Sequence, residues 1–135
     1  MLERAEILNI IDEAYASRAR GDLAGVARFL APGAKFRIAG DHAALTSFSA
    51  VPGGAAGAEA AVAALMNTFD FLEHERVNVV VEGGKAAVHW RVLVQAGDKE
   101  PVPTELFDLW TFNDEGKIVS FLQFADTAMV ARLMA

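Results

Sequence analysis

Asp108 is an acidic residue among large apolar side chains, in the segment LFDLWTF at residues 106–112. Because side chains alternate along a strand, Asp108 shares one face with Leu106 and Trp110, and both faces of the segment are mostly apolar. A carboxylate kept away from water either holds its proton or finds a hydrogen-bond donor. Asp108 is therefore predicted to be an acid or hydrogen-bond donor in an apolar pocket, or else a structural carboxylate satisfied by Tyr15, a histidine or a backbone group.

Two further polar groups, Gln123 and Tyr15, stand in apolar patterns. Gln123 shares a strand face with Phe121 and Ala125 near the end of the chain. Tyr15 lies on the apolar stripe of the first predicted helix, where it is either a core aromatic residue with a satisfied hydroxyl or a hydrogen-bond donor.

His89 is the first candidate for a general base, because the pKa of an unperturbed imidazole lies near neutrality. It shares a strand face with Arg91, opposite Val88 and Trp90. If that face is turned toward the interior, His89 could accept a proton from a ligand. If it is turned outward, His89 and Arg91 are solvated or interface residues.

The remaining acids and histidines have simpler interpretations. Asp41 follows Gly40 and is either a turn-forming residue or a second candidate base at the mouth of a pocket. Asp126 precedes a helix-like C-terminal segment and is predicted to cap it, with a site role as the alternative. His42, in a predicted loop, and His74, in a charged run, are both expected to face solvent.

Length and composition indicate one compact domain over residues 1–135, with 53% hydrophobic residues. The net charge of -6, without a basic stripe, argues against a nucleic-acid partner. There is no cysteine, and the three histidines are scattered, so we expect neither a metal site nor another cofactor. No signal peptide and no apolar run long enough for a membrane span is recognisable, so we expect a cytoplasmic protein without a membrane partner.

Helices are predicted first along the chain and strands afterwards. Apolar spacings of three and four indicate a first helix, a short second helix follows Asp22, and a third helix precedes the strand-rich part. The expected helices are residues 3–20, 23–30 and 58–69, and the expected strands are 34–39, 72–81, 85–95, 104–112 and 117–125, with a long loop at 40–57. Short turns between the last four strands require antiparallel pairing, so we predict an α+β fold with three N-terminal helices packed on a curved, mainly antiparallel sheet.

Three features together resemble the nuclear transport factor 2-like superfamily, which includes the SnoaL-like polyketide cyclases and the ketosteroid isomerases. They are Gly21-Asp22 after the first helix, Gly57 opening the third, and the run DLWTFNDEGKI before the closing strand. The resemblance implies a cystatin-like cone that encloses a largely apolar cavity, and a homodimer.

The isomerase pattern also implies roles for individual residues. Asp108 falls where these enzymes keep a protonated acid that donates to the developing oxyanion, and Tyr15 falls one residue from the second donor. The general base, however, corresponds to Ile38, which cannot move a proton. Positions implied for the pocket wall are Phe36, Ile38, Leu106, Trp110, Phe121 and Gln123.

The sequence therefore predicts a protein that binds a small hydrophobic molecule, carbonyl-bearing or polycyclic. Proton transfer next to the carbonyl, as in an isomerase or cyclase, is the catalytic hypothesis, with Asp108 as oxyanion donor. Because the expected base is missing, a ligand carrier without catalysis and a dimeric protein-interaction module are the alternatives.

Overall fold

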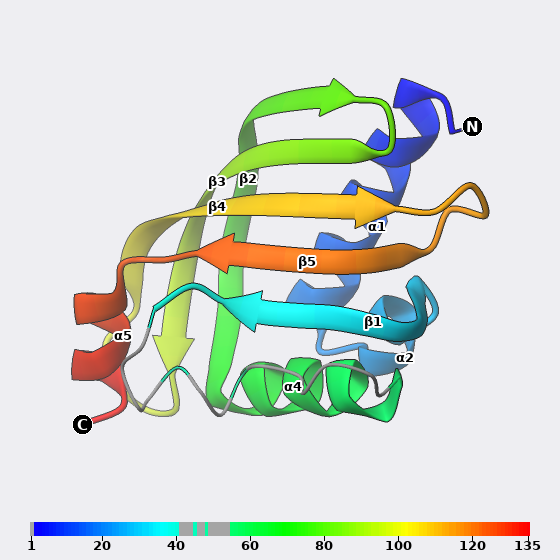
Figure 1. Ribbon diagram of the computed structural model, residues 1–135. Coiled ribbons are helices and arrows are strands. Elements are labelled where there is room, and N and C mark those ends of the chain that lie inside the picture. The colour runs from blue at the N-terminus through cyan, green and yellow to red at the C-terminus, as the bar shows by residue number, and fades with distance from the viewer. Residues whose placement is uncertain (1, 41–44, 46–47, 49–54) are drawn as a thin grey trace.

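The computed structural model describes residues 2–40, 45, 48 and 55–135. Its described elements, in chain order, are α1 (Arg4–Arg20), α2 (Leu23–Ala27), β1 (Leu30–Ile38), α4 (Ala55–Thr68), β2 (Phe69–Glu82), β3 (Lys85–Ala96), β4 (Val102–Phe112), β5 (Ile118–Phe124) and α5 (Thr127–Leu133) (Figure 1). The predicted α+β class is confirmed. The helix α5 follows the last strand, in addition to the predicted N-terminal helices.

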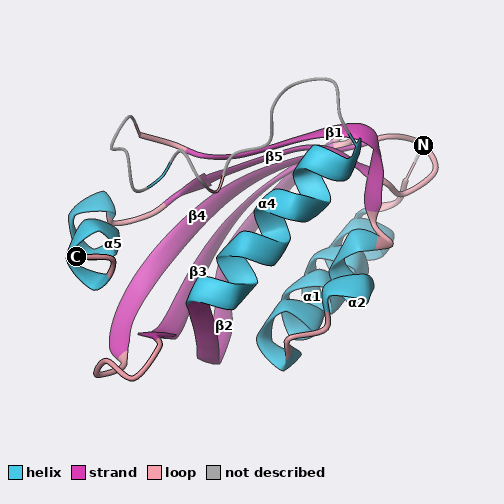
Figure 2. Ribbon diagram, turned by 90° about the horizontal axis from the view of Figure 1, so that it is seen from below, coloured by secondary structure: helices cyan, strands magenta, loops and turns pink. Residues whose placement is uncertain are grey.

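The five strands form one curved sheet in the order β1-β5-β4-β3-β2. The pairs β2–β3, β3–β4 and β4–β5 are antiparallel, as the short turns require, whereas β1 runs parallel to β5. Helices α1, α2 and α4 lie together on the concave side of this sheet (Figure 2). The space between these helices and the sheet is where the apolar core forms.

Helix α1 is delimited by its sequence at both ends. Glu3 and Glu6 form a capping box at its start, and Gly21 ends it in the left-handed conformation, with a φ of 74°. Its buried stripe includes Ile7, Ile11, Ala14 and Tyr15, and it continues through Ser17 and Arg18. The stripe thus carries two polar residues into the interior at its C-terminal end.

The first strand begins earlier than predicted, and the second helix is correspondingly shorter. Helix α2 ends at Ala27, and β1 already pairs with β5 at Leu30, so the prediction of helix up to residue 30 and strand from 34 is wrong at this junction. The reason is a local irregularity. The register against β5 shifts between Leu30 and Lys35, and Gly33 has a φ of 75°, which lets the strand bulge rather than stop.

The predicted loop at residues 40–57 falls largely outside the described residues, and so do Asp41 and His42. Helix α4 begins at Ala55, before the predicted position 58. No helix in the described ranges is long and apolar enough to cross a membrane.

The two faces of the sheet differ in exposure. The concave face is buried, and in β3 and β4 it carries Val88, Trp90, Val92, Leu106, Asp108 and Trp110. The convex face leaves large apolar side chains exposed, including Phe107 at 46% and Phe124 at 49%.

Candidate functional site

The carboxylate of Asp108 is fully buried, at 0% exposure, and accepts three hydrogen bonds from side chains. The Tyr15 hydroxyl donates to Oδ2 at 2.6 Å, and the Trp90 indole N–H donates to the same oxygen at 3.0 Å. The Gln123 amide donates to Oδ1 at 3.0 Å and also reaches the Tyr15 oxygen at 3.3 Å. The sequence did not determine the hydrogen-bond partners of Asp108. They are Tyr15, Trp90 and Gln123, and the four side chains form one hydrogen-bonded network.

Strand register and helix position explain how these groups meet. Asp108 on β4 stands directly opposite Gln123 on β5, at the separation at which cross-strand side chains interact. Trp90 comes from β3 on the same concave face. Tyr15 belongs to α1. Its ring stacks on the indole of Trp90, with the ring centroids 3.7 Å apart and the ring planes inclined by 9°. The stack fixes the direction of the Tyr15 hydroxyl toward Asp108.

Burial shifts the acid–base properties of this network. It raises the pKa of Asp108 from 3.8 to about 7, against the opposing effect of hydrogen bonds from Tyr15, Gln123 and Trp90. The Trp110 indole is also near enough to lower this pKa, although its N–H has no partner within hydrogen-bonding geometry. Burial, reinforced by the charge of Asp108, raises the pKa of Tyr15 well above its ordinary value, so Tyr15 stays a neutral hydroxyl near pH 7.

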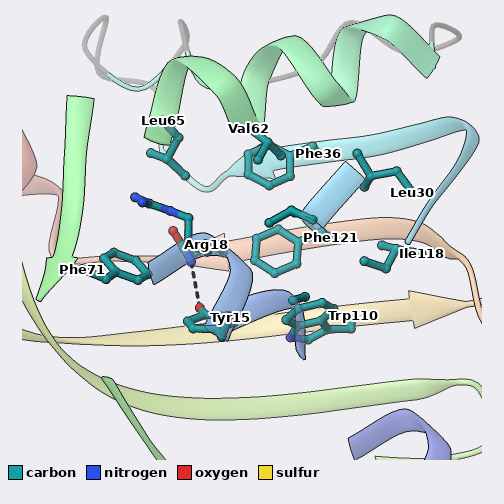
Figure 3. Close-up of a pocket in the computed structure, with 13 residues that line it drawn as sticks. Tyr15, Arg18, Leu30, Phe36, Val62, Leu65, Phe71, Trp110, Ile118 and Phe121 are labelled. Atoms are coloured by element: carbon teal, nitrogen blue, oxygen red, sulfur yellow. Dashed lines mark hydrogen bonds between the residues drawn. The ribbon is translucent and has the colours of Figure 1, made fainter. Parts of the chain in front are cut away.

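An apolar cavity lies next to this network, between α1, α4 and the sheet (Figure 3). It leaves about 60 Å³ for the centres of water-sized molecules. Its wall includes Tyr15, Arg18, Phe36, Trp110, Phe121 and Gln123. Asp108 is not part of this wall, because Tyr15 and Gln123 stand between its carboxylate and the cavity.

A second apolar cavity, with about 40 Å³ of such room, adjoins the first. The two share Arg18, Leu65, Phe71 and Gln123 as wall residues. Ile38 and Leu106 belong to the second wall. The interior hollow is therefore a pair of small chambers that meet at the side chains of Arg18 and Gln123.

Arg18 is the one charged side chain on both walls among the described residues. It is 8% exposed, and its guanidinium lies 4.1 Å from the centre of the Phe71 ring. Figure 3 shows the guanidinium reaching from α1 to between Leu65 and Phe71. Burial lowers the pKa of Arg18 from its ordinary value to about 10, so the group remains charged at neutral pH.

The structure brings most residues of the sequence hypothesis to one place. Tyr15 and Asp108 are hydrogen-bonded, and the predicted wall residues surround one chamber or the other: Phe36, Trp110, Phe121 and Gln123 the first, and Ile38, Leu106 and Gln123 the second.

His89 is not brought to the site. It lies on the convex side of β3, where the Asn78 amide donates to Nδ1 at 3.1 Å and Nε2 donates to Glu105 at 2.6 Å. Trp90, its neighbour in the chain, occupies the concave side. His89 therefore faces outward, which is the second of the two alternatives that the sequence allowed.

The other polar candidates also have structural surroundings. Asp126 accepts a hydrogen bond from the Met129 backbone N–H and caps α5. His74 is exposed, with its ring centre 6.2 Å from that of Tyr15. Within the described part of the chain, no cluster of three His, Asp or Glu residues is placed to bind a metal ion.

Sequence reasoning missed Arg18, Trp90 and Phe71. Arg18 follows Ile7, Ile11 and Ala14 at spacings of three and four, and this pattern places it on the buried stripe of α1. A basic residue at that position was a usable signal. The alternation of side chains along the strand showed that Trp90 and His89 lie on opposite faces. The hydrogen bond from Trp90 to Asp108, however, depends on the register of β3 against β4.

Comparisons with known proteins agree with this architecture. A putative isomerase from Rhodopseudomonas palustris superposes with a TM-score of 0.80 at 16% identity, covering 99% of this chain and 98% of that one. An NTF2-like protein of unknown function from Burkholderia pseudomallei gives 0.77 at 20% identity, with coverage of 96% and 98%. A steroid delta-isomerase from Pseudomonas aeruginosa gives 0.67 at 20% identity, with coverage of 98% and 88%.

At these identities, the solved structures establish the fold alone. No curated protein matches the sequence. The model of the SnoaL-like domain family matches residues 11–121, which is most of the chain. The chain therefore belongs to the SnoaL-like domain family, within the NTF2-like fold.

Proposed function

We propose that this protein binds a small, mainly apolar, carbonyl-bearing molecule in the first chamber and promotes proton transfer next to the carbonyl. The observation that carries the proposal is the Tyr15 hydroxyl on the chamber wall, 2.6 Å from a buried carboxyl group whose pKa is raised to about 7. The isomerases that share the fold support the same class of reaction.

The chemistry follows from the direction of one hydrogen bond. While Asp108 is ionised, it accepts a hydrogen bond from the Tyr15 hydroxyl, so the hydroxyl cannot donate to a ligand. Once Asp108 is protonated, it can donate to the Tyr15 oxygen, which frees the Tyr15 O–H to turn toward the chamber. When water or hydroxide from the solvent removes a proton from the carbon beside the ligand carbonyl, the C–H electron pair moves toward the carbonyl oxygen, and Tyr15 can donate to that oxygen.

The size of the chamber limits the ligand. Room of about 60 Å³ for water centres corresponds to on the order of four water molecules. Drug-sized ligands need pockets of roughly 300–1,000 Å³. A steroid-sized molecule exceeds this room, so the ligand that we propose is no larger than a single ring with a short side chain.

A non-catalytic carrier is the second candidate function. None of the described wall residues of either chamber is a carboxylate or an imidazole that could accept the ligand proton. Ile38 occupies the position that the resemblance gives to the base, and its side chain lies on the second wall. A carrier needs the apolar chamber and the Tyr15 donor, but no base.

Phenylacetone is a suitable probe, because it has one ring and an enolisable carbonyl. We expect the wild type to accelerate exchange of its benzylic protons with D₂O, measured by ¹H NMR. Tyr15→Phe should slow the exchange by about 100-fold, the usual effect of losing an oxyanion donor, whereas His89→Gln should not. Asp108→Asn should retain the exchange, because its amide N–H can donate to the Tyr15 oxygen as the protonated acid does. Binding without exchange would support the carrier. Exchange as fast in Tyr15→Phe as in the wild type would contradict the role of Tyr15, and loss of exchange in Asp108→Asn would contradict the role of protonated Asp108.

The assembly that we propose is a homodimer formed through the convex face of the sheet. Phe107 on β4 stands opposite Phe124 on β5, and both rings are exposed near the centre of that face. Leu109, also exposed, continues the patch toward the next register position. A second copy of the same chain would cover this contiguous apolar surface with its own counterpart.

A further inference from the structure

Two buried side-chain donors in the described part of the chain have no hydrogen-bond partner: Arg18 Nη2 and Trp110 Nε1. Both residues line the first chamber. The Trp110 indole acts on Asp108, so its N–H is directed at the buried network rather than at the chamber. Buried polar groups in proteins nearly always have partners, so Arg18 Nη2 marks a place where a ligand atom is expected.

Arg18 is the one buried arginine among the described residues. Arg20, Arg28, Arg76 and Arg91 each lie within 4 Å of an acidic side chain, at 3.7, 3.6, 2.9 and 3.9 Å respectively. Arg18 has no such ion pair among the described residues. Asp70 attracts it from farther away and Phe71 offers its ring face, but neither supplies a hydrogen-bond acceptor to Nη2.

An unpaired buried cation is costly, because the interior replaces neither its hydration nor its counter-charge. A carboxylate in the chamber would supply both, since guanidinium and carboxylate groups match as planar, two-point partners. The apolar rings around the chamber would receive the rest of the ligand.

We propose that Arg18 binds a carboxylate group of the ligand, and that the ligand is a one-ring keto acid. Tyr15 and Arg18 are three residues apart on α1, so they stand on the same side of the helix, and both reach the first chamber. The ligand carboxylate lies at Arg18 and its keto oxygen at Tyr15. The position of the carboxylate is independent of catalysis, whereas the keto group rests on the function proposed above.

Phenylpyruvate and phenylacetone form a matched pair of probes. They share the ring, the methylene and the ketone, and they differ in a carboxylate against a methyl group. By isothermal titration calorimetry at pH 7, the wild type should bind phenylpyruvate about 10- to 100-fold more tightly than phenylacetone, as expected for hydrogen bonds to a charged group. Arg18→Met should abolish this preference while leaving the affinity for phenylacetone within about two-fold, a change of under 1 kcal/mol.

Arg20→Met is the control, since Arg20 is an exposed arginine two residues away on the same helix. It should keep the full preference. Because Arg18 has no ion-pair partner among the described residues, Arg18→Met leaves no partner charge unpaired, so we expect the variant to fold, and a thermal melt checks this. Arg18→Gln, which keeps a polar side chain without the charge, should give the same loss of preference if the methionine variant does not fold.

Three results would overturn the inference, and they separate it from the function proposed above. Equal affinity of the wild type for both probes would exclude an acidic ligand and leave a neutral carbonyl ligand in place. A preference that survives in Arg18→Met would locate the carboxylate elsewhere. Binding of neither probe would contradict both proposals.

Discussion

At the scale of single residues, the defining feature is a carboxyl group with three hydrogen-bond donors and no exposure to solvent. Burial raises the pKa of Asp108 from 3.8 to about 7. Between those two values, the native state holds a proton that the unfolded state has lost, so the free energy of unfolding falls as the pH rises. The stabilising contribution is complete below about pH 4 and is lost as the pH passes through about 7.

Urea denaturation of the wild type and of Asp108→Asn between pH 4.5 and pH 8 tests this titration. The variant carries no carboxyl group at this position, so the other titrations of the two proteins should cancel in the difference. The free energy of unfolding of the wild type relative to the variant should fall by up to about 1.4 kcal/mol per pH unit below pH 7 and stay level above it. A difference that is constant throughout would mean that Asp108 titrates alike in both states.

The sequence predicted part of this site because strand alternation is local information. Parity alone placed Asp108 beside Trp110 and Gln123 beside Phe121 on single strand faces. It could not show that Asp108 faces Gln123 across two strands, since that depends on register. Arg18 was missed for a different reason: a charged residue at the end of a helix is ordinarily solvated, and its burial here results from how α1 packs against α2 and β2.

At the scale of elements, β1 shows where local patterns mislead. Pro32 and Gly33 indicated the end of a helix, and they lie instead inside a strand that is held by parallel pairing with β5. Proline lacks the N–H that regular pairing needs, and Gly33 adopts a positive φ, so both fit an irregular strand. The pairing partner is far away in sequence and cannot be inferred from the residues around the bulge.

Substitutions at Gly33 test this account of the strand. A Cβ at Gly33 would meet no atom within 4 Å, so any cost reflects backbone strain rather than a clash. Gly33→Ala should lower the free energy of unfolding by about 1–2 kcal/mol, because left-handed backbone is unfavourable for alanine. Gly33→Asn should lose less, since asparagine tolerates that conformation. Equal stability of all three proteins in urea would show that the strand does not require a positive φ there.

At the scale of the whole molecule, the sheet separates two functions. Its concave face surrounds the chambers, and its convex face carries the apolar patch of Phe107, Leu109 and Phe124 proposed as the dimer contact. Curvature follows from the twist of long antiparallel strands and from the irregular register of β2, and it gives the helices a hollow to cover.

The double variant Phe107→Lys/Phe124→Lys tests the dimer. In the proposed dimer, the introduced lysines of the two copies would face one another at the centre of the contact and repel. We therefore expect sedimentation velocity to show a dimer for the wild type and a monomer for the variant. Val80→Lys is the control, because Val80 is an exposed apolar residue on the edge strand β2. A wild type that sediments as a monomer, or a variant that remains dimeric, would contradict the proposed contact.

The parallel pairing of β1 with β5 also affects how the protein is made. Phe36 and Ile38 can pair with Phe121 and Gln123 only after α4 and the strands β2, β3 and β4 that lie between them in the chain have left the ribosome. Such distant pairing slows folding, because a long loop must close before any contact compensates for the lost entropy. Helices α1, α2 and α4 and the β2–β4 meander can assemble before β5 emerges, but the hollow that receives a ligand is completed only with β5, so a nascent chain cannot be loaded before β5 has been made.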